Sequence, residues 1–220
     1  KKKIKTVFIK KNYKNQKDEI NLLKKRGKII STNSREEALS IAEKRKFQVA
    51  LLDDGLQQKN IIYDLKIACF NSDEGLGNGY LLPAGPLRES MDELKGYHIA
   101  FLNGEKKNNK LYKKLKSINK NLKIFEGKYV PRNLKNFNRN KEYLMFCAIG
   151  NPQEFKNTLL KFNFKIKHTV IFPDHYKISS YKIKNLKVMA KKQGLTIITT
   201  EKDYLRLDKA ETKNIKFLKV

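Results

Sequence analysis

The sequence has 220 residues, with 49 Lys and Arg against 22 Asp and Glu, so its net charge is +27. This length allows one large core or two small ones, and a hydrophobic fraction of 40% excludes a disordered chain. No apolar run reaches the roughly 18 residues that a membrane span needs. The excess of Lys is spread along the chain without a recognition motif, which favours a solvated basic surface over a nucleic-acid stripe.

Short apolar runs alternate with amphipathic stretches through the first half of the chain. This alternation is typical of a parallel α/β sheet. A capping box, Ser34 with Glu37 three residues later, marks the beginning of one predicted helix. The predicted elements of this half are strands 6–10, 28–31, 48–52, 65–70, 98–102 and 122–127, and helices 18–26 and 34–45.

A connector is predicted between the two halves. The apolar periodicity is lost after Gly127, and Asn, Arg and Pro131 gather there, which suits a linker better than a core element. We therefore predict a first domain at 1–128, a linker at 129–141 and a second α/β domain at 142–220. The predicted elements of the second half are strands 143–149, 164–172, 196–200 and 215–220, a helix from Pro152 and a helix at 179–192.

The two cysteines, Cys69 and Cys147, lie in apolar strand-like runs. We expect two buried free thiols in a reducing compartment. The sequence has no paired Cys and His spacing of the kind that binds zinc.

Two segments of the first half carry candidate chemistry. Asp53 and Asp54 end the apolar strand VALL, where ligands collect in open α/β sheets, so they are metal or substrate candidates; a simple Asp-Gly turn is the alternative. The segment 75–89 holds four glycines and two prolines and ends in Arg88 and Glu89. An Arg fork suits phosphate and a carboxylate suits Mg²⁺, whereas the alternative is a surface pair at a helix start.

Two further segments follow strands of the second half. In 172–176, FPDHY, His175 could relay a proton and Asp174 could orient it, with a structural turn as the alternative. In 199–203, TTEKD, polar groups follow the strand TIITT. They predict either an anion site at a helix N-terminus or a helix cap.

The order of these segments resembles one family. DDGLQ, GNGYLLPAGPLRE, GNP at 150–152, PDHY and TTEKD occur in the order found in tetraacyldisaccharide 4′-kinases, the lipid A 4′-kinases, from about Asp18 to the last strand. The resemblance implies transfer of the γ-phosphate of ATP, with Mg²⁺, to the 4′-hydroxyl of a tetraacylated glucosamine disaccharide 1-phosphate. It implies two α/β/α sandwich domains joined by a short β linker, the first of the P-loop type.

The resemblance also implies a place and partners for the protein. These are the lipid A disaccharide precursor and the anionic inner-membrane surface on its cytoplasmic face. Separately, we expect no specific nucleic-acid partner, since no recognition motif accompanies the charge, and a monomer. Carried over by position, the site residues are Asp18 and His175 as the catalytic pair; Tyr13, Asn78, Arg88 and Asp174 for substrate or phosphate; Asp53, Asp54 and Gln57 for the cofactor; and Glu89 with Asp54 for the metal.

The sequence departs from the family in four places. It has no G-x-x-x-x-G-K followed by Ser or Thr, it has KKNYK where the family has SRGYG, and it has Gln58 where the family has His. The long segment that the family has between SRGYG and the catalytic Asp is reduced to Asn15–Lys17. We therefore expect an N-terminally truncated chain that lacks the P-loop and is inactive alone. The alternatives are a non-catalytic remnant that binds lipid A precursor or anionic membrane through its basic surface, and a nucleic-acid binder that acts by charge.

Overall fold

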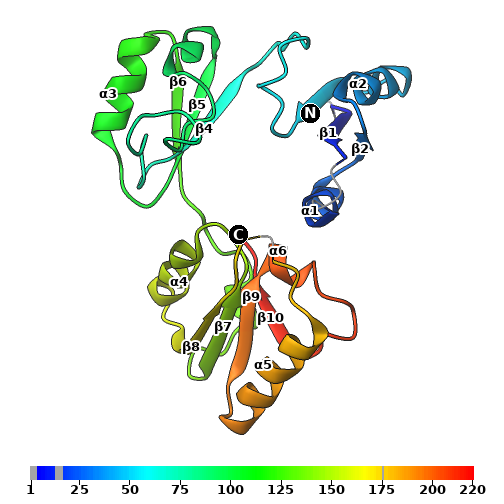
Figure 1. The fold of residues 1–220 in the computed structure, drawn as a ribbon, viewed down its shortest axis with the longest axis vertical. Coiled ribbons are helices and arrows are strands. Elements are labelled where there is room, and N and C mark those ends of the chain that lie inside the picture. Colours follow the sequence, from blue (N-terminus) through cyan, green and yellow to red (C-terminus); the bar gives the residue numbers. More distant parts are fainter. Residues whose placement is uncertain (1–3, 13–16, 175) are drawn as a thin grey trace. The chain divides into compact units, whose positions relative to one another are not determined.

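The structure is a computed structural model that describes residues 4–12, 17–174 and 176–220, apart from the side chains of Lys17 and Asp18. The chain forms two compact units. Unit 1 comprises Lys1–Asp53 and Pro131–Val220, and unit 2 comprises Asp54–Val130. Figure 1 shows the course of the chain through both units, each of which is built from parallel strands and helices.

Unit 1 begins with a three-stranded parallel sheet of order β2-β1-β3. Val7 and Ile9 alternate along its central strand and are fully buried, as a half-covered strand requires. They pack against Ala38 and Ala42 of a helix whose start is capped by the Ser34 side chain. The elements are β1 (Thr6–Lys11), α1 (Lys17–Arg26), β2 (Ile29–Thr32), α2 (Arg35–Lys44) and β3 (Val49–Leu52).

The C-terminal part of unit 1 is a four-stranded parallel sheet of order β10-β9-β7-β8. Its central strand β7 is buried on both faces, which explains why LMFC reads as a continuous apolar run. Met145 packs with Leu159 of α4 on one face, and Phe146 packs with Ile183 of α5 on the other. The elements are β7 (Glu142–Cys147), α4 (Pro152–Lys161), β8 (Lys165–Ile171), α5 (Ser180–Lys192), β9 (Thr196–Thr200), α6 (Glu201–Tyr204) and β10 (Ile215–Leu218), preceded by the 3-10 helix η2 (Leu134–Asn136).

Unit 2 holds a second three-stranded parallel sheet, of order β4-β5-β6. One face packs on a helix through Leu102, Leu111 and Leu115. The opposite face leaves Phe101 and Phe125 more than one-third exposed. The elements are β4 (Ile67–Asn71), the 3-10 helix η1 (Met91–Gly96), β5 (Ile99–Asn103), α3 (Asn109–Ile118) and β6 (Lys123–Gly127).

The structure confirms the α/β class and every strand and helix predicted from the sequence. Helix α3 was not predicted, although Leu111, Leu115 and Ile118 recur at helical spacing. The break between the units at Val130 and Pro131 falls inside the predicted linker, and the assignment of 1–128 to one domain stays a prediction. Within the described ranges, no helix is long and apolar enough to cross a membrane.

The prediction for the cysteines is half wrong. Cys147 is fully buried, and burial, together with the negative charge of Asp203, raises the pKa of its thiol to about 12. Cys69 is exposed, because it points to the face of β4 that carries no helix in unit 2. An apolar run shows that a strand exists but does not show whether both of its faces are covered.

The central position of β9 gives a stability prediction. Ile198 is fully buried in the core between the sheet and α4, so Ile198→Ala should lower the free energy of unfolding by about 2–5 kcal/mol. Ile171 on β8 is 55% exposed, and Ile171→Ala should cost less than about 1 kcal/mol. Urea unfolding curves of the two variants check this, and equal losses would contradict the assignment of the core.

Candidate active site

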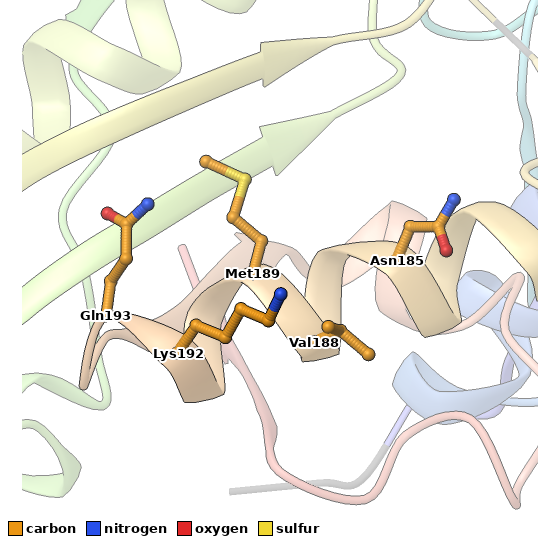
Figure 2. Close-up of a pocket in the computed structure, with 5 residues that line it drawn as sticks. All are labelled: Asn185, Val188, Met189, Lys192 and Gln193. Atoms are coloured by element: carbon orange, nitrogen blue, oxygen red, sulfur yellow. The ribbon is translucent and has the colours of Figure 1, made fainter.

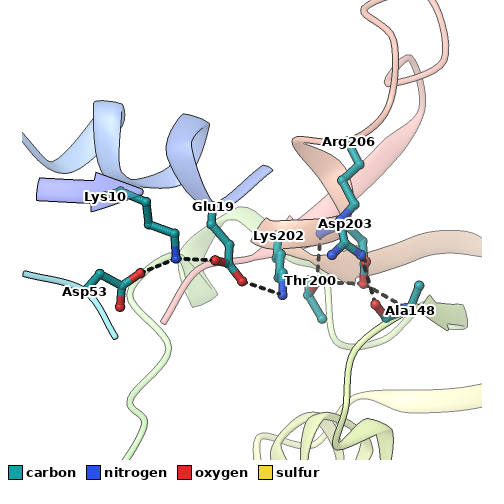
Figure 3. Close-up of polar contacts among 8 residues, drawn as sticks. All are labelled: Lys10, Glu19, Asp53, Ala148, Thr200, Lys202, Asp203 and Arg206. Carbon is teal, nitrogen blue, oxygen red and sulfur yellow. Dashed lines mark hydrogen bonds and ion pairs between the residues drawn. The ribbon is translucent and has the colours of Figure 1, made fainter. Parts of the chain in front are cut away.

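A buried lysine joins two carboxylates at one edge of the first sheet. Lys10 lies near the end of β1, and Asp53 directly follows β3, the neighbouring parallel strand. The ammonium of Lys10 lies 2.5 Å from Oδ2 of Asp53 and 2.5 Å from Oε2 of Glu19 on α1 (Figure 3). Since the carboxyl ends of parallel strands share one edge, the register alone brings Lys10 and Asp53 together.

The charge of this lysine is stabilised where it lies. Lys10 is only 3% exposed, and burial alone would lower the pKa of its ammonium. Hydrogen bonds to Asp53 and Glu19, and the charges of both carboxylates, outweigh burial and raise the pKa above its ordinary 10.5. The cluster therefore holds a permanent cation at neutral pH, in contact with the first aspartate of the DDG motif.

In unit 2 an arginine fork faces the second aspartate of the same motif. Nη1 of Arg88 donates to Oδ1 of Asp54 at 2.7 Å, and Nη2 donates to Oε1 of Gln57 at 3.1 Å. Both charged side chains are more than half exposed, so the pair adds at most about 1 kcal/mol to stability. The structure thus brings three predicted site residues together at an accessible point. The two parallel N–H donors of the Arg88 guanidinium have the geometry with which arginine binds the oxygens of a phosphate or carboxylate.

The Gly/Pro-rich loop before Arg88 is fixed from within. The amide of Asn78 donates to the Ala84 carbonyl at 2.8 Å and accepts from the Tyr80 N–H at 3.1 Å. A Cβ atom at Gly85 would lie 2.2 Å from the Asn78 side chain and 2.4 Å from the Tyr80 carbonyl, so only glycine fits there. Asn78 therefore shapes the loop, while substrate binding by Asn78 stays a prediction.

Glu89 and Arg88 are adjacent in the sequence but bind different partners, and the partner of Glu89 is Tyr97. The Glu89 carboxylate accepts a hydrogen bond from the Tyr97 hydroxyl, and burial, with the charge of Glu89, raises the pKa of Tyr97. Among the described residues, no group of three or more His, Cys, Asp or Glu side chains is placed to hold a metal ion by itself. Mg²⁺ in proteins is usually bound by one or two carboxylates, with waters and substrate phosphates as its other ligands.

The GNP and PDHY motifs approach each other beyond β7 and β8. A Cβ atom at Gly150 would lie 3.3 Å from Oδ2 of Asp174, so the lack of a side chain at 150 lets the two segments meet. Asn151 caps α4 by accepting from the N–H of Glu154 at 3.0 Å. Rings of Phe172 and Tyr176 stack 5.6 Å apart on either side of Asp174 in the chain.

The TTEKD motif is a helix cap with a buried carboxylate. The hydroxyl of Thr200 accepts from the N–H of Asp203 and donates to its carboxylate, so the cap interpretation made from the sequence is confirmed. Oδ2 of Asp203 also accepts from the N–H of Ala148 at 3.0 Å (Figure 3). Lys10, Glu19 and Arg206 complete these clusters but were missed by sequence reasoning, because no local pattern identifies long-range ion pairs.

Three of the predicted site positions lie wholly or partly outside the described residues. These are Tyr13 and His175, and Asp18, for which only the backbone is described as part of α1. The pairing of Asp18 with His175 stays a prediction.

A hollow of about 280 Å³ lies along α5 (Figure 2). Its lining consists of Asn185, Val188, Met189, Lys192 and Gln193, and none of these was predicted as a site residue. Gln193 is already engaged with the ring of His168 at 2.7 Å. The hollow therefore offers one amide and one ammonium, and no acid–base pair.

The Lys10 cluster predicts an alkaline dependence of stability. Lys10→Met removes the cation that lies between the two partly exposed carboxylates and, among the described residues, leaves only Glu19 with another ion pair, to Lys202, so we expect a loss of about 1–3 kcal/mol at pH 7. Because the pKa of folded Lys10 is raised, its contribution is complete below pH 10.5 and disappears as the pH rises through the folded value.

The measurement is urea unfolding of the wild type and Lys10→Met at several pH values from 7 to 11. Lys167→Met, which removes an exposed ion pair with Glu142, is the matched control and should cost less than about 1 kcal/mol. A difference between wild type and Lys10→Met that stays constant through pH 11 would contradict the assigned ion pairs.

Comparison with known proteins adds to this geometry. The family model for tetraacyldisaccharide-1-P 4′-kinase matches residues 1–220. A tetraacyldisaccharide 4′-kinase from Pelagibacter ubique is 44% identical over 217 residues, which cover 98% of this chain and 69% of that protein. Its counterpart from Rickettsia akari is 34% identical over 193 residues, covering 87% of this chain and 58% of the relative. The chain thus spans between about three-fifths and two-thirds of these relatives.

A solved structure shares the fold. It is described as the "apo" form of LpxK from Aquifex aeolicus in complex with ATP, and it superposes with a TM-score of 0.65 at 21% identity, covering 98% of this chain and 73% of that one. Since the family model covers every residue and the Pelagibacter protein matches nearly the full length, the chain belongs to the tetraacyldisaccharide 4′-kinase family.

Proposed function

We propose that this chain is part of a kinase that transfers the γ-phosphate of ATP to the 4′-hydroxyl of a tetraacylated glucosamine disaccharide 1-phosphate in lipid A synthesis. The names of the family and of its relatives support this substrate, and the ATP complex of the Aquifex protein supports the donor. The observation that carries the proposal is the Arg88 fork on Asp54 and Gln57, which joins the LRE and DDG motifs at an accessible point.

Phosphoryl transfer depends on placing the reactants and on neutralising charge. The guanidinium of Arg88 has two donors already directed to oxygen atoms of Asp54 and Gln57. A phosphate oxygen could replace either acceptor with little rearrangement, because the arginine is held by the internally fixed loop that ends beside it. Arg88 is therefore assigned to a phosphate group, with Asn78 shaping its loop and Tyr13 and Asp174 assigned to substrate.

The residues fit a magnesium ion that is bound partly through phosphates. Asp53, Asp54, Gln57 and Glu89 offer oxygen donors, which Mg²⁺ prefers, and one or two carboxylates are the usual protein share of such a site. Asp54 and Glu89 would hold the ion, and Asp53 would support the nucleotide. When bound, the ion would supply positive charge for the phosphate oxygens.

Asp18 is assigned as the general base. Its carboxylate would accept the proton of the 4′-hydroxyl as the oxygen bonds to phosphorus and the bond to the ADP oxygen breaks. His175 would pair with Asp18 and keep it in the state that accepts a proton. Asp174, against Gly150, would help to place the histidine.

The basic surface suits a peripheral protein at the anionic inner membrane. A net charge of +27 gives many side chains that can gain about 1 kcal/mol each near anionic lipid. We propose this cytoplasmic membrane face as the place of action and a monomer as the acting form. The 220 residues contain no P-loop motif, so we expect them to transfer no phosphate unaided.

The same charge favours a second candidate function. A chain without catalytic competence could bind lipid A precursor or anionic vesicles through its lysines alone. Full-length protein that binds anionic vesicles and transfers no phosphate to the disaccharide would support this candidate and overturn the kinase proposal.

Substitution of Arg88 in the full-length protein tests the phosphate assignment. Arg88→Ala should lower kcat/KM by about 10²-fold or more, and Arg88→Lys should recover only part of the loss, because lysine keeps the charge without the fork. Arg132→Ala, at an exposed position of unit 1, is the control and should leave kcat/KM unchanged. The measurement is transfer of labelled phosphate from ATP to the lipid, and wild-type kinetics for Arg88→Ala would remove the assignment.

The acid–base assignment predicts non-additive effects in the full-length protein. Asp18→Ala should lower kcat by at least about 10²-fold, and His175→Ala should lower kcat more than it raises KM. The double variant should be little worse than Asp18→Ala, because the two groups act as one unit. Near-normal kcat in both single variants would contradict the acid–base assignment, and PDHY would then be interpreted as a structural turn.

A further inference from the structure

The TTEKD motif has no part in the proposed chemistry, yet it contacts two segments that do. Its last three residues, 201–203, lie in α6 (Glu201–Tyr204), directly after β9. Two residues of α6 pair with α1, which carries Asp18, and Asp203 of α6 contacts the residue directly after β7, which leads to GNP. Both contacts lie within unit 1.

The contact with α1 consists of two ion pairs. Lys202 lies 3.5 Å from Oε1 of Glu19, and Arg26 lies 3.2 Å from Oε2 of Glu201 (Figure 3 draws the first pair). Glu19 and Arg26 are seven residues apart, which is two helical turns, so they lie on one face of α1. Two attachments on the same face fix both the rotation of α1 and its position along its axis. Glu19 is the neighbour of Asp18.

The contact at the end of β7 consists of hydrogen bonds to the backbone of one residue, Ala148. Ala148 is fully buried, and its N–H donates to Asp203 at 3.0 Å while its carbonyl accepts from Nη1 of Arg206 at 2.9 Å. Arg206 also pairs with Asp203 at 3.0 Å, so the two side chains hold each other in place. Both polar backbone groups of Ala148 are thus occupied, by the side chain of Asp203 in the motif and by that of Arg206, three residues beyond it.

The hydrogen bonds to Ala148 lie close in the chain to Gly150, which approaches the PDHY segment at 173–176. Two residues beyond Ala148, Gly150 approaches the carboxylate of Asp174, and Asp174 is bonded to His175. A shift of the β7 end would therefore move the surface on which the PDHY segment rests.

We propose that Lys202, Asp203 and Arg206 are positioning residues that set α1 and the PDHY segment relative to each other. This inference rests on the proposed function, because it takes Asp18 and His175 as the reacting pair. The residues touch neither substrate nor cofactor in it. Their effect is on kcat, since displacement of a base by about 1 Å is costly for transfer and nearly neutral for binding.

Lys202 gives the sharpest test, because it is partly exposed and its loss should leave the fold intact. In the full-length protein, Lys202→Met should lower kcat about tenfold or more, with KM values for ATP and lipid within about threefold and Tm within about 3 °C. Lys202→Arg should restore most of kcat. Lys167→Met, which breaks the 3.1 Å pair with Glu142 on β7, is the matched control and should keep wild-type kcat.

Amide hydrogen exchange supplies a second readout that does not depend on activity. Lys202→Met should speed exchange in residues 17–26 about tenfold, and Lys167→Met should not. Unchanged exchange there, or an unchanged kcat in an active enzyme, would overturn the inference. A wild-type protein that transfers no phosphate would instead overturn the proposed function, and the exchange result would still decide whether α6 holds α1.

Discussion

Parallel strand pairing is the constraint on which the rest of the molecule depends. Each strand of a parallel sheet must be followed by a crossover, and the carboxyl ends of its neighbours meet at one edge. In unit 1, Lys10 and Asp53 are neighbours because β1 and β3 end side by side, and GNP, PDHY and TTEKD follow β7, β8 and β9 of one sheet. The fold thus gathers chemistry that the sequence distributes over more than a hundred residues.

The ion pairs at these edges differ in how deeply they are buried. Burial determines whether a pair contributes to stability or leaves its charged groups accessible to a ligand. Lys10 is buried and compensates two carboxylates, so its removal should be felt in stability. Arg88 and Asp54 are exposed, so their pair adds little to stability and leaves the guanidinium available to a phosphate. Asp203 is fully buried but has a complete set of donors, which makes it a structural anchor for Ala148.

The sequence allowed the elements to be predicted wherever one periodicity dominated. The run LMFC in β7 and the capping box before α2 are local signals, and the structure confirms both. Helix α3 was not predicted from the sequence, because lysines at most of its other positions obscure the apolar stripe of Leu111, Leu115 and Ile118. The exposure of Cys69 could not be predicted, because it depends on which face of a sheet receives a helix. Nor could the contacts of Lys10 and Lys202, since no local rule tells which of 49 cations meets which of 22 anions.

The Lys10 cluster limits which amino-acid substitutions its three positions can accept during evolution. A lysine held by two carboxylates is a set of three positions whose charges are balanced together. If Asp53 is retained for the nucleotide, only Lys10 and Glu19 remain to vary, and a change at either one alters the charge balance around Asp53. Loss of the lysine alone takes the ammonium from Asp53 but leaves Glu19 paired with Lys202, and loss of Glu19 alone leaves the Lys10 ammonium paired with Asp53. Because Glu19 keeps its pair with Lys202, a small polar residue at position 10 is compatible with an acidic residue at position 19, and the cost of that change falls on Asp53.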